Sequence, residues 1–175
     1  MNCFINSIET FGLVDGPGIR TVVFMSGCKL RCLYCHNPDT WDKNGGMEYT
    51  PYELVEKIKK YRTYFESSGG GVTFSGGEPL LQKEFLIQTL KLCKEVGIHT
   101  TIDTAGVGDG MYEEILKYTD LVLFDIKHID SEKYENLVKS TIKHMDNYEF
   151  NLVSAETENF IWNDFCSNYI EFSKF

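Results

Sequence analysis

Short apolar runs that are rich in β-branched residues alternate along this chain with stretches of helical periodicity. The runs have the length and composition of buried strands, and one helical stretch begins with a potential capping box at Thr50 and Glu53. Strands that are joined through helices predict a parallel sheet with right-handed crossovers, and hence an α/β fold. The predicted strands are 21–26, 72–75, 98–103 and 121–126, and the predicted helices are 51–61, 85–96, 111–118 and 131–139.

The length of the chain limits whether these strands and helices can form a closed barrel. A closed eight-fold barrel takes about 250 residues, whereas this chain has 175. We therefore expect a partial, open parallel β/α barrel that is truncated on its C-terminal side. Residues 1–140 are the expected core domain, and residues 141–175, which lose the strand–helix alternation, are an expected divergent tail. A missing flank would expose apolar strand edge, so we expect poor solubility or self-association.

Charge and hydropathy exclude two classes of function. The formal net charge is −9, which disfavours nonspecific nucleic-acid binding because such binding needs a basic face. No apolar run approaches the roughly 18–20 residues that cross a bilayer. The N-terminus also lacks the basic flank and apolar stretch of a secretory signal. We therefore expect a cytoplasmic protein without nucleic-acid or membrane partners, whose thiols stay reduced.

Cys28, Cys32 and Cys35 lie close together and have the spacing C-x3-C-x2-C. Three thiolates from one tight loop can bind three irons of a cubane cluster and leave the fourth iron open for another ligand. Zinc is the alternative, although structural zinc usually takes four protein ligands in paired spacings. His36 directly follows Cys35, which would make it an awkward fourth ligand. The spacing therefore favours an iron–sulfur cluster.

An unusual loop follows each predicted strand. The cysteines come after the first strand and Gly76-Gly77-Glu78-Pro79 after the second, while Asp103-Thr104 and Asp125-Ile126-Lys127 lie at the ends of the third and fourth. In a sheet of parallel strands the carboxyl ends meet at one edge, where active sites form. The sequence therefore predicts that these loops converge on one site.

These motifs carry a family resemblance. The cysteine loop, with Tyr34 before its third cysteine, resembles the cluster motif of radical S-adenosylmethionine enzymes, and Gly76-Gly77-Glu78 resembles their second motif. The resemblance implies a 4Fe–4S cluster on Cys28, Cys32 and Cys35. It also implies S-adenosylmethionine as the cofactor, bound near Tyr34 with its amino group at the second motif, and cleaved to a 5′-deoxyadenosyl radical. The ordinary alternative for the glycines is a role in turns.

Several longer segments resemble one branch of that family, the enzymes that activate pyruvate formate-lyase. The resemblance covers about residues 8–139, and several motifs together are more specific than the cysteine spacing alone. It implies hydrogen abstraction from a glycine of pyruvate formate-lyase, a glycyl-radical protein, with flavodoxin or ferredoxin as electron donor. The matching segments are 14–20 (VDGPGIR), 32–37 (CLYCHN), 39–41 (DTW), 69–77 (GGGVTFSGG) and 97–100 (GIHT).

The same resemblance implies roles for single residues. Asp15 would face the glycine-bearing loop of the partner. Asp103, Thr104 and Asp125 resemble a monovalent-cation site beside the cofactor carboxylate, and Lys127 would help to hold the cofactor. The alternatives are that the carboxylates only cap loops at strand ends and that the lysine is a solvated charge.

Two other interpretations fit part of the sequence. The activating protein of anaerobic ribonucleotide reductase is short and has the same cluster loop, but segments 69–79 and 97–104 favour the formate-lyase branch. A noncatalytic cluster-binding fragment would lack the further strand–helix units, and the histidine, that the resemblance implies beyond residue 140. Of the other cysteines, Cys93 lies on an apolar helical stripe, which indicates a buried thiol, and Cys3 and Cys166 have no assigned role.

Overall fold

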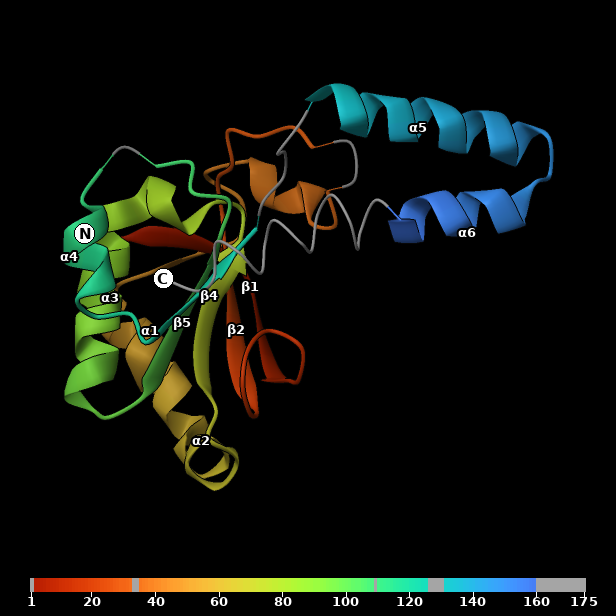
Figure 1. Cartoon of the computed structure of the whole chain (residues 1–175). Coiled ribbons are helices and arrows are strands. Elements are labelled where there is room, and N and C mark those ends of the chain that lie inside the picture. The colour runs from red at the N-terminus through yellow and green to blue at the C-terminus, as the bar shows by residue number, and fades with distance from the viewer. Residues whose placement is uncertain (1, 33–34, 109, 126–130, 160–175) are drawn as a thin grey trace. The chain divides into compact units, whose positions relative to one another are not determined.

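The computed structural model describes residues 2–32, 35–108, 110–125 and 131–159. The chain forms two compact units, Met1–Asp125 and Ile126–Phe175. The first unit contains the sheet and every described residue of the predicted site, and the described part of the second consists of two helices (Figure 1). The division at residue 125 lies before the predicted boundary at residue 140, which falls inside the helix Ser131–Asp146.

The strands of the first unit are β1 (Cys3–Gly12), β2 (Arg20–Met25), β3 (Met47–Tyr49), β4 (Gly71–Gly76), β5 (His99–Thr104) and β6 (Leu121–Phe124). They form one six-stranded sheet in the order β3-β1-β2-β4-β5-β6. The four predicted strands are present and pair in parallel, which confirms the open α/β sheet. Strands β1 and β3 pair antiparallel and are not expected from the sequence pattern.

The helices of the first unit are α1 (Pro51–Ile58), α2 (Arg62–Ser68), α3 (Lys83–Glu95) and α4 (Tyr112–Leu116), with 3₁₀ turns η1 (Pro38–Trp41), η2 (Lys59–Tyr61) and η3 (Pro79–Gln82). The predicted capping box at the start of α1 is confirmed. The amide of Glu53 donates to Thr50 Oγ1 at 3.2 Å, and the amide of Thr50 donates to Glu53 Oε2 at 2.9 Å. The predicted helix 51–61 changes to a 3₁₀ turn at η2, so α1 is shorter than expected.

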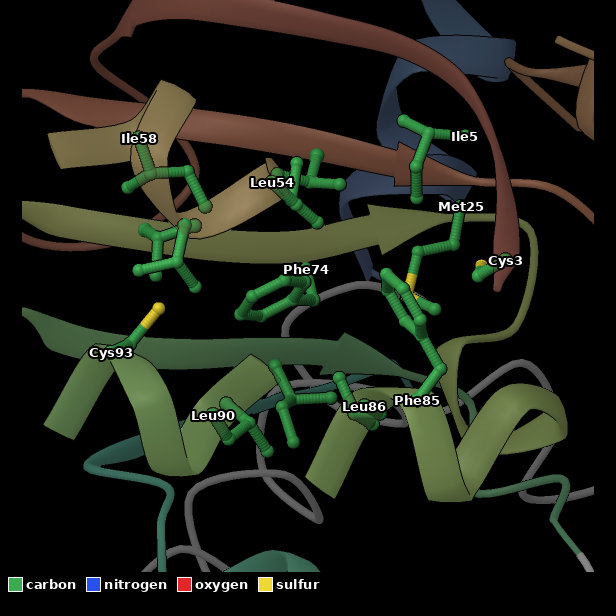
Figure 2. Packing of buried hydrophobic residues seen from close by; sticks show 14 of the residues in the cluster. Cys3, Ile5, Met25, Leu54, Ile58, Phe74, Phe85, Leu86, Leu90 and Cys93 are labelled. Carbon is green, nitrogen blue, oxygen red and sulfur yellow. The ribbon is translucent and has the colours of Figure 1, made fainter. Parts of the chain in front are cut away.

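One face of the sheet packs against α1 and α3 (Figure 1). Figure 2 shows side chains from both helices and from the strands filling the space between them. Phe74 of β4 and Leu86 and Leu90 of α3 are fully buried there. Cys93 is also buried, which confirms the buried thiol that the sequence predicts, and burial raises its pKa to about 12. This face supplies the hydrophobic core of the unit.

The other face of the sheet is polar where β4 and β5 meet. Successive strand residues point to opposite faces, so the residues between core positions point away from the helices. The register pairs Thr73 with Thr101, and Ser75 Oγ donates to Asp103 Oδ2 at 2.6 Å. The loop before β2 also reaches this face, because the carbonyl of Asp15 accepts a hydrogen bond from Thr73 Oγ1 at 2.7 Å.

The sheet ends at β6, which in the described part of the chain has a strand neighbour on one side only. Its last residue, Phe124, is 48 % exposed. An apolar edge of this kind is a template for pairing with another chain. Self-association therefore remains the expected behaviour of the chain.

The second unit contains, within residues 131–159, the helices α5 (Ser131–Asp146) and α6 (Phe150–Asn159). The predicted helix 131–139 is confirmed and extends further. Polar contacts join the two helices: Ser140 Oγ donates to Glu156 Oε2 at 2.5 Å, and His144 Nε2 lies 3.3 Å from Glu156 Oε1. In addition, His144 Nδ1 lies 2.7 Å from Oε2 of Glu149, which directly precedes α6. The contact with Glu149 raises the pKa of His144. None of the helices in the described ranges is both long and apolar enough to cross a membrane.

Candidate functional site

The structure places the loops of the predicted site at one edge of the sheet. Because β2, β4, β5 and β6 are parallel, the residues that follow them leave the sheet at its carboxyl edge. The cysteines follow β2, and Gly77 and Glu78 follow β4. Ala105 follows β5, and Asp125 follows β6. The predicted convergence of the loops is thus confirmed, while the chemical role of each residue remains a prediction.

The cysteine loop, residues 27–36, is fastened at its start by main-chain hydrogen bonds. The amide of Gly27 donates to the carbonyl of Thr40 at 2.6 Å, and the amide of Cys28 donates to the carbonyl of Trp41 at 3.4 Å. Both acceptors belong to η1, which therefore braces the loop. The main chain at Cys28, the first predicted ligand, is thus held in place by these bonds.

Further along, hydrogen bonds link the described residues of the cysteine loop to one another. The amide of Cys35 donates to the carbonyl of Cys32 at 3.2 Å, and Nη1 of Arg31 donates to the carbonyl of Cys28 at 2.7 Å. The Arg31 guanidinium lies 4.8 Å from the centre of the Trp41 ring, a cation–π contact. The thiols of Cys28, Cys32 and Cys35 are half-buried and form no disulfide. All three are therefore chemically able to act as ligands.

The Cys28 thiol lies within electrostatic range of the other two thiols and of Glu78. Burial raises the pKa of Cys28, and the nearby carboxylate and thiols raise it further. Bound positive charge would relieve the repulsion among these groups. Three thiols from one loop also suit a cluster with an open iron better than a structural zinc site. Within the described ranges, however, no three Cys, His, Asp or Glu side chains converge closely enough to hold a metal ion, so the ligand set remains a prediction.

Gly76 and Gly77 press the turn after β4 against the end of β2. Gly76 has a φ of +97°, and a Cβ there would lie 2.7 Å from the amide nitrogen of Met25. A Cβ at Gly77 would lie 2.3 Å from the carbonyl oxygen of Gly27. Only glycine fits such approaches between two main chains. The glycines therefore have the turn role that the sequence offered as an alternative, and they place the turn directly beside the cysteine loop. Their predicted contact with the cofactor stays a prediction.

The carboxylate of Glu78 joins the ends of β4 and β5. The side chain is 2 % exposed. Its Oε1 accepts hydrogen bonds from the amide of Leu80 at 3.2 Å and from Thr104 Oγ1 at 2.5 Å, and its Oε2 accepts one from the amide of Ala105 at 3.0 Å. Burial raises the pKa of Glu78, and the hydrogen bonds lower it by less. Glu78 and Thr104, which were predicted separately, are thus brought into direct contact.

Oxygen atoms of the predicted cation site lie on two neighbouring strand ends. Asp103 Oδ2 accepts the hydrogen bond from Ser75, and the carbonyl of Thr104 accepts one from the amide of Asp125 at 2.8 Å. A carbonyl oxygen has a second lone pair, so this bond leaves Thr104 able to bind a cation. Carboxylate and carbonyl oxygens are the donors that hard cations prefer.

Four residues named from the sequence lie outside the described part of the chain. Among them are Tyr34 and Lys127, which were predicted to contact the cofactor, and Cys166, while Ile126 of the fourth strand end is a further one. Asp15, predicted to face the partner, lies on the polar face of the sheet rather than in the turns that follow the parallel strands. The site thus has a carboxyl-edge part and a separate polar-face part.

Arg20 is a buried residue for which the sequence suggested no role of its own. It begins β2 and has 0 % of its surface exposed. Burial lowers its pKa to about 10, so the guanidinium stays charged near neutral pH. The sequence offered only a weak indication that Arg20 is buried. Its charge lies at the start of an apolar strand, and two other buried strands carry hydroxyls, at Thr73 and Thr101, that could bind it.

Comparison with protein families gives two matches. The model described as the Radical SAM superfamily matches residues 22–152, which include the parallel strands and the cysteine loop. The model described as the anticodon-binding domain of tRNA ligase matches residues 131–175 and overlaps the first match at its end. The second match lies outside the unit that carries the predicted site, and the acidic charge of the chain, −9, does not favour nucleic-acid binding.

Three curated relatives share the name pyruvate formate-lyase-activating enzyme. The chain is 70 % identical over 128 residues to the protein from Clostridium pasteurianum, covering 73 % of this chain and 54 % of the relative. It is 54 % identical over 137 residues to the protein from Staphylococcus epidermidis, and 51 % identical over 136 residues to that from Listeria monocytogenes. Each of these matches covers 74 % of this chain and 55 % of the relative. The chain thus spans about half the length of the curated relatives it matches.

A solved structure with a similar fold is that of QueE from Escherichia coli. It superposes with a TM-score of 0.52 at 15 % sequence identity, covering 70 % of this chain and 69 % of QueE. At this identity the likeness concerns the fold alone. It confirms the α/β arrangement of parallel strands and helices that the sequence predicts.

Proposed function

Because the chain belongs to the radical S-adenosylmethionine superfamily, we propose that it acts as an activating enzyme for pyruvate formate-lyase. The proposal follows the name shared by relatives that are 51–70 % identical to it. Their similarity extends over 128–137 residues, which is 73–74 % of this chain. The proposal includes a 4Fe–4S cluster and S-adenosylmethionine as cofactors, which are those of the family.

The observation that carries the proposal is the direct connection between the cysteine loop and the glycine turn. The amide of Gly77 donates to the carbonyl of Met25 at 2.8 Å, and the amide of Glu78 donates to the carbonyl of Gly27 at 2.9 Å. Both acceptors lie within three residues of Cys28. A ligand that binds the cluster and the turn together would find the two parts already positioned, which lowers the entropy lost on binding.

Each part of the carboxyl edge has a role in this proposal. Cys28, Cys32 and Cys35 bind three irons of the cluster. The turn Gly76-Gly77-Glu78 binds the amino group of the cofactor, and the Glu78 carboxylate keeps the turn fixed to the end of β5. We assign Tyr34 to the cofactor as well.

The neighbouring strand ends complete the proposed site. Asp103, Thr104 and Asp125 offer oxygen ligands to a monovalent cation beside the cofactor carboxylate. Lys127 contacts the cofactor, and Asp15 contacts the glycine-bearing loop of the partner. The cation would balance the negative charge that the two aspartates bring to this edge.

The proposed reaction needs the cluster, the cofactor and two protein partners. When bound, the reduced cluster and S-adenosylmethionine supply a 5′-deoxyadenosyl radical, which takes a hydrogen atom from a glycine of pyruvate formate-lyase. Flavodoxin or ferredoxin is the proposed electron donor. A cytoplasmic location belongs to the proposal, because the thiol ligands need a reducing compartment.

The test is a direct assay of the purified chain without oxygen. Iron and sulfide are supplied, the protein is reduced, and S-adenosylmethionine is added. The products to measure are 5′-deoxyadenosine and, with pyruvate formate-lyase present, the glycyl radical by electron paramagnetic resonance. Cys32→Ser is the negative control, since it removes one cluster ligand.

We expect both products from the unaltered chain and neither from the control. Cofactor cleavage without a partner radical would restrict the function to cofactor chemistry. A chain that binds iron and sulfide but cleaves nothing would favour the noncatalytic cluster-binding interpretation. Equal cleavage by Cys32→Ser would contradict the proposed ligand set.

A further inference from the structure

The buried guanidinium of Arg20 forms hydrogen bonds with the loop before β2 and with the two strands β4 and β5. Its Nη1 donates to the carbonyl of Pro17 at 2.9 Å, and its Nη2 donates to the carbonyl of Val72 at 2.7 Å. Nη2 also donates to Thr101 Oγ1 at 2.8 Å and lies 3.3 Å from His99 Nδ1. A fully buried guanidinium with this many acceptors has a single well-defined position.

Thr73 connects this fixed charge to Asp15. Nε of Arg20 donates to Thr73 Oγ1 at 2.6 Å, and the same hydroxyl donates its own proton to the carbonyl of Asp15 at 2.7 Å. A hydroxyl that accepts a bond from a cation becomes a stronger donor, so the two bonds reinforce each other. Thr73 is itself fully buried in β4. The main chain of Asp15 is thus tied to the sheet through one side-chain hydroxyl.

The DGPG loop, residues 15–18, has little room to move toward the sheet. Gly16 has a φ of +125°, and a Cβ there would lie 3.0 Å from Cδ of Arg20. A Cβ at Gly18, whose φ is +67°, would lie 2.5 Å from the amide nitrogen of Gly70. The freedom that remains to the loop is to lift away from the sheet. The bond from Arg20 opposes this movement at Pro17, and the bond from Thr73 opposes it at Asp15.

We propose that Thr73 is a positioning residue for partner recognition, which transmits the fixed position of Arg20 to the main chain of Asp15. The inference rests on the proposed function, because Asp15 is the residue expected to face the glycine-bearing loop of the partner. Leu13 and Val14, which precede it, are exposed to solvent. The loop is therefore held on its other side, by the bond from Thr73 to the Asp15 carbonyl and by the bond from Arg20 to the Pro17 carbonyl.

Thr101 offers a matched control for Thr73. The two threonines are register partners on adjacent parallel strands, and both accept a hydrogen bond from Arg20. Of these two hydroxyls, only that of Thr73 also bonds the DGPG loop in the described contacts. Replacing either threonine with valine removes a hydroxyl and keeps the branched shape. The two variants therefore differ in the link to Asp15.

The first arm of the test measures the loop in the full chain and needs no activity. With the glycines labelled with ¹⁵N, nuclear magnetic resonance relaxation gives order parameters for Gly16 and Gly18. We expect Thr73→Val to lower them from about 0.85 toward about 0.6, and Thr73→Ser and Thr101→Val to leave them unchanged. An unchanged loop in Thr73→Val, or equal loosening in both valine variants, would overturn the inference.

The second arm measures partner activation. We expect Thr73→Val to raise the KM for pyruvate formate-lyase about tenfold with kcat nearly unchanged, and Thr73→Ser to restore the KM. A fall in kcat with no change in KM would overturn the inference, because it would place the effect at the cofactor. If the unaltered chain activates no partner, the proposed function fails, and the order parameters alone decide whether Thr73 positions the loop.

Discussion

On the face that packs against α1 and α3, β4 presents Val72 and Phe74, whereas on the opposite face it presents Thr73 and Ser75. The apolar side chains meet others from helices and strands in a shared core (Figure 2). The hydroxyls instead bind particular atoms: Thr73 binds the loop before β2, and Ser75 binds Asp103. Residues one position apart in a strand thus differ in what they contribute.

The difference shows how one strand can serve stability and function at once. Burial of apolar area is non-directional, so neighbouring side chains can replace one another with limited loss. Hydrogen bonds to named atoms depend on geometry, so a small shift removes them. We therefore expect changes on the helix-packed face to lower the free energy of unfolding, and changes on the polar face to alter the loops.

The largest expected effect is on the helix-packed face. Phe74→Ala should lower the free energy of unfolding by about 3–5 kcal/mol, because it leaves a cavity in the core. Ser75→Ala, one position along, should lower it by only about 1 kcal/mol, the typical value of one hydrogen bond. Urea denaturation, followed by a probe in the first unit, measures both. Similar losses of unfolding free energy in the two variants would contradict the proposed difference between the two faces of β4.

Glu78→Gln tests the polar group that connects two strand ends. The amide nitrogen of glutamine would face a main-chain N–H, so we expect a loss of about 1–3 kcal/mol in the free energy of unfolding. Hydrogen exchange at Ala105, whose amide donates to the carboxylate, should become faster. A variant with unchanged exchange at this amide would show that the carboxylate does not hold the turn.

A smaller effect is expected at the start of α1, far in sequence from the predicted ligands. Thr50→Ala removes the N-cap and half of the capping box, and it should lower the free energy of unfolding by about 1 kcal/mol. Thermal denaturation measures the loss, and Tyr52→Ala, an exposed position in the same helix, serves as the control. Iron binding should not change in either variant. A change in iron binding would mean that the helix layer and the site are coupled.

The smallest expected effect depends on pH. Burial lowers the pKa of His99 below its ordinary value of 6.5, and the nearby Arg20 lowers it further. Below pH 6.5 the unfolded chain therefore binds more protons at this residue, so its contribution to stability falls with decreasing pH. Between about pH 7.5 and pH 5.5 the unaltered chain should lose more stability than His99→Gln. Equal losses in the two proteins would contradict the burial of His99 beside a cation.

The four parallel strands could be predicted because each is a short, buried, apolar run between turn signals. Strand β1 escaped prediction because Cys3 and Ile5 are its only fully buried residues, and polar residues such as Glu9 interrupt it. Its partner β3 has three residues, too few for a pattern to appear. In the second unit, the sequence indicated the beginning of α5 and missed α6.

The candidate site was predictable where its residues form local motifs. The cysteine loop and the glycine turn are contiguous in sequence, and parallel strands bring them together. The contact of Arg20 with Thr73 joins residues 53 positions apart, so no local sequence pattern predicts it. The place of Glu78 in the turn predicted to bind the cofactor was evident from its motif, and that role stays a prediction. Its hydrogen bonds to Leu80, Thr104 and Ala105 were not predictable, because they depend on the register of β4 and β5.

The central claim is that the cysteine loop binds the metal and the hydrophobic core does not. Its most direct test compares a cysteine of the loop with a cysteine of the core. Cys32→Ser and Cys93→Ala are assayed for bound iron and sulfide after reconstitution and for the free energy of unfolding without metal. We predict that Cys32→Ser loses the cluster at unchanged stability, and that Cys93→Ala loses about 1 kcal/mol of stability and keeps the cluster. A cluster retained in Cys32→Ser, or lost in a folded Cys93→Ala, would contradict the claim that the cysteine loop binds the metal and the core does not.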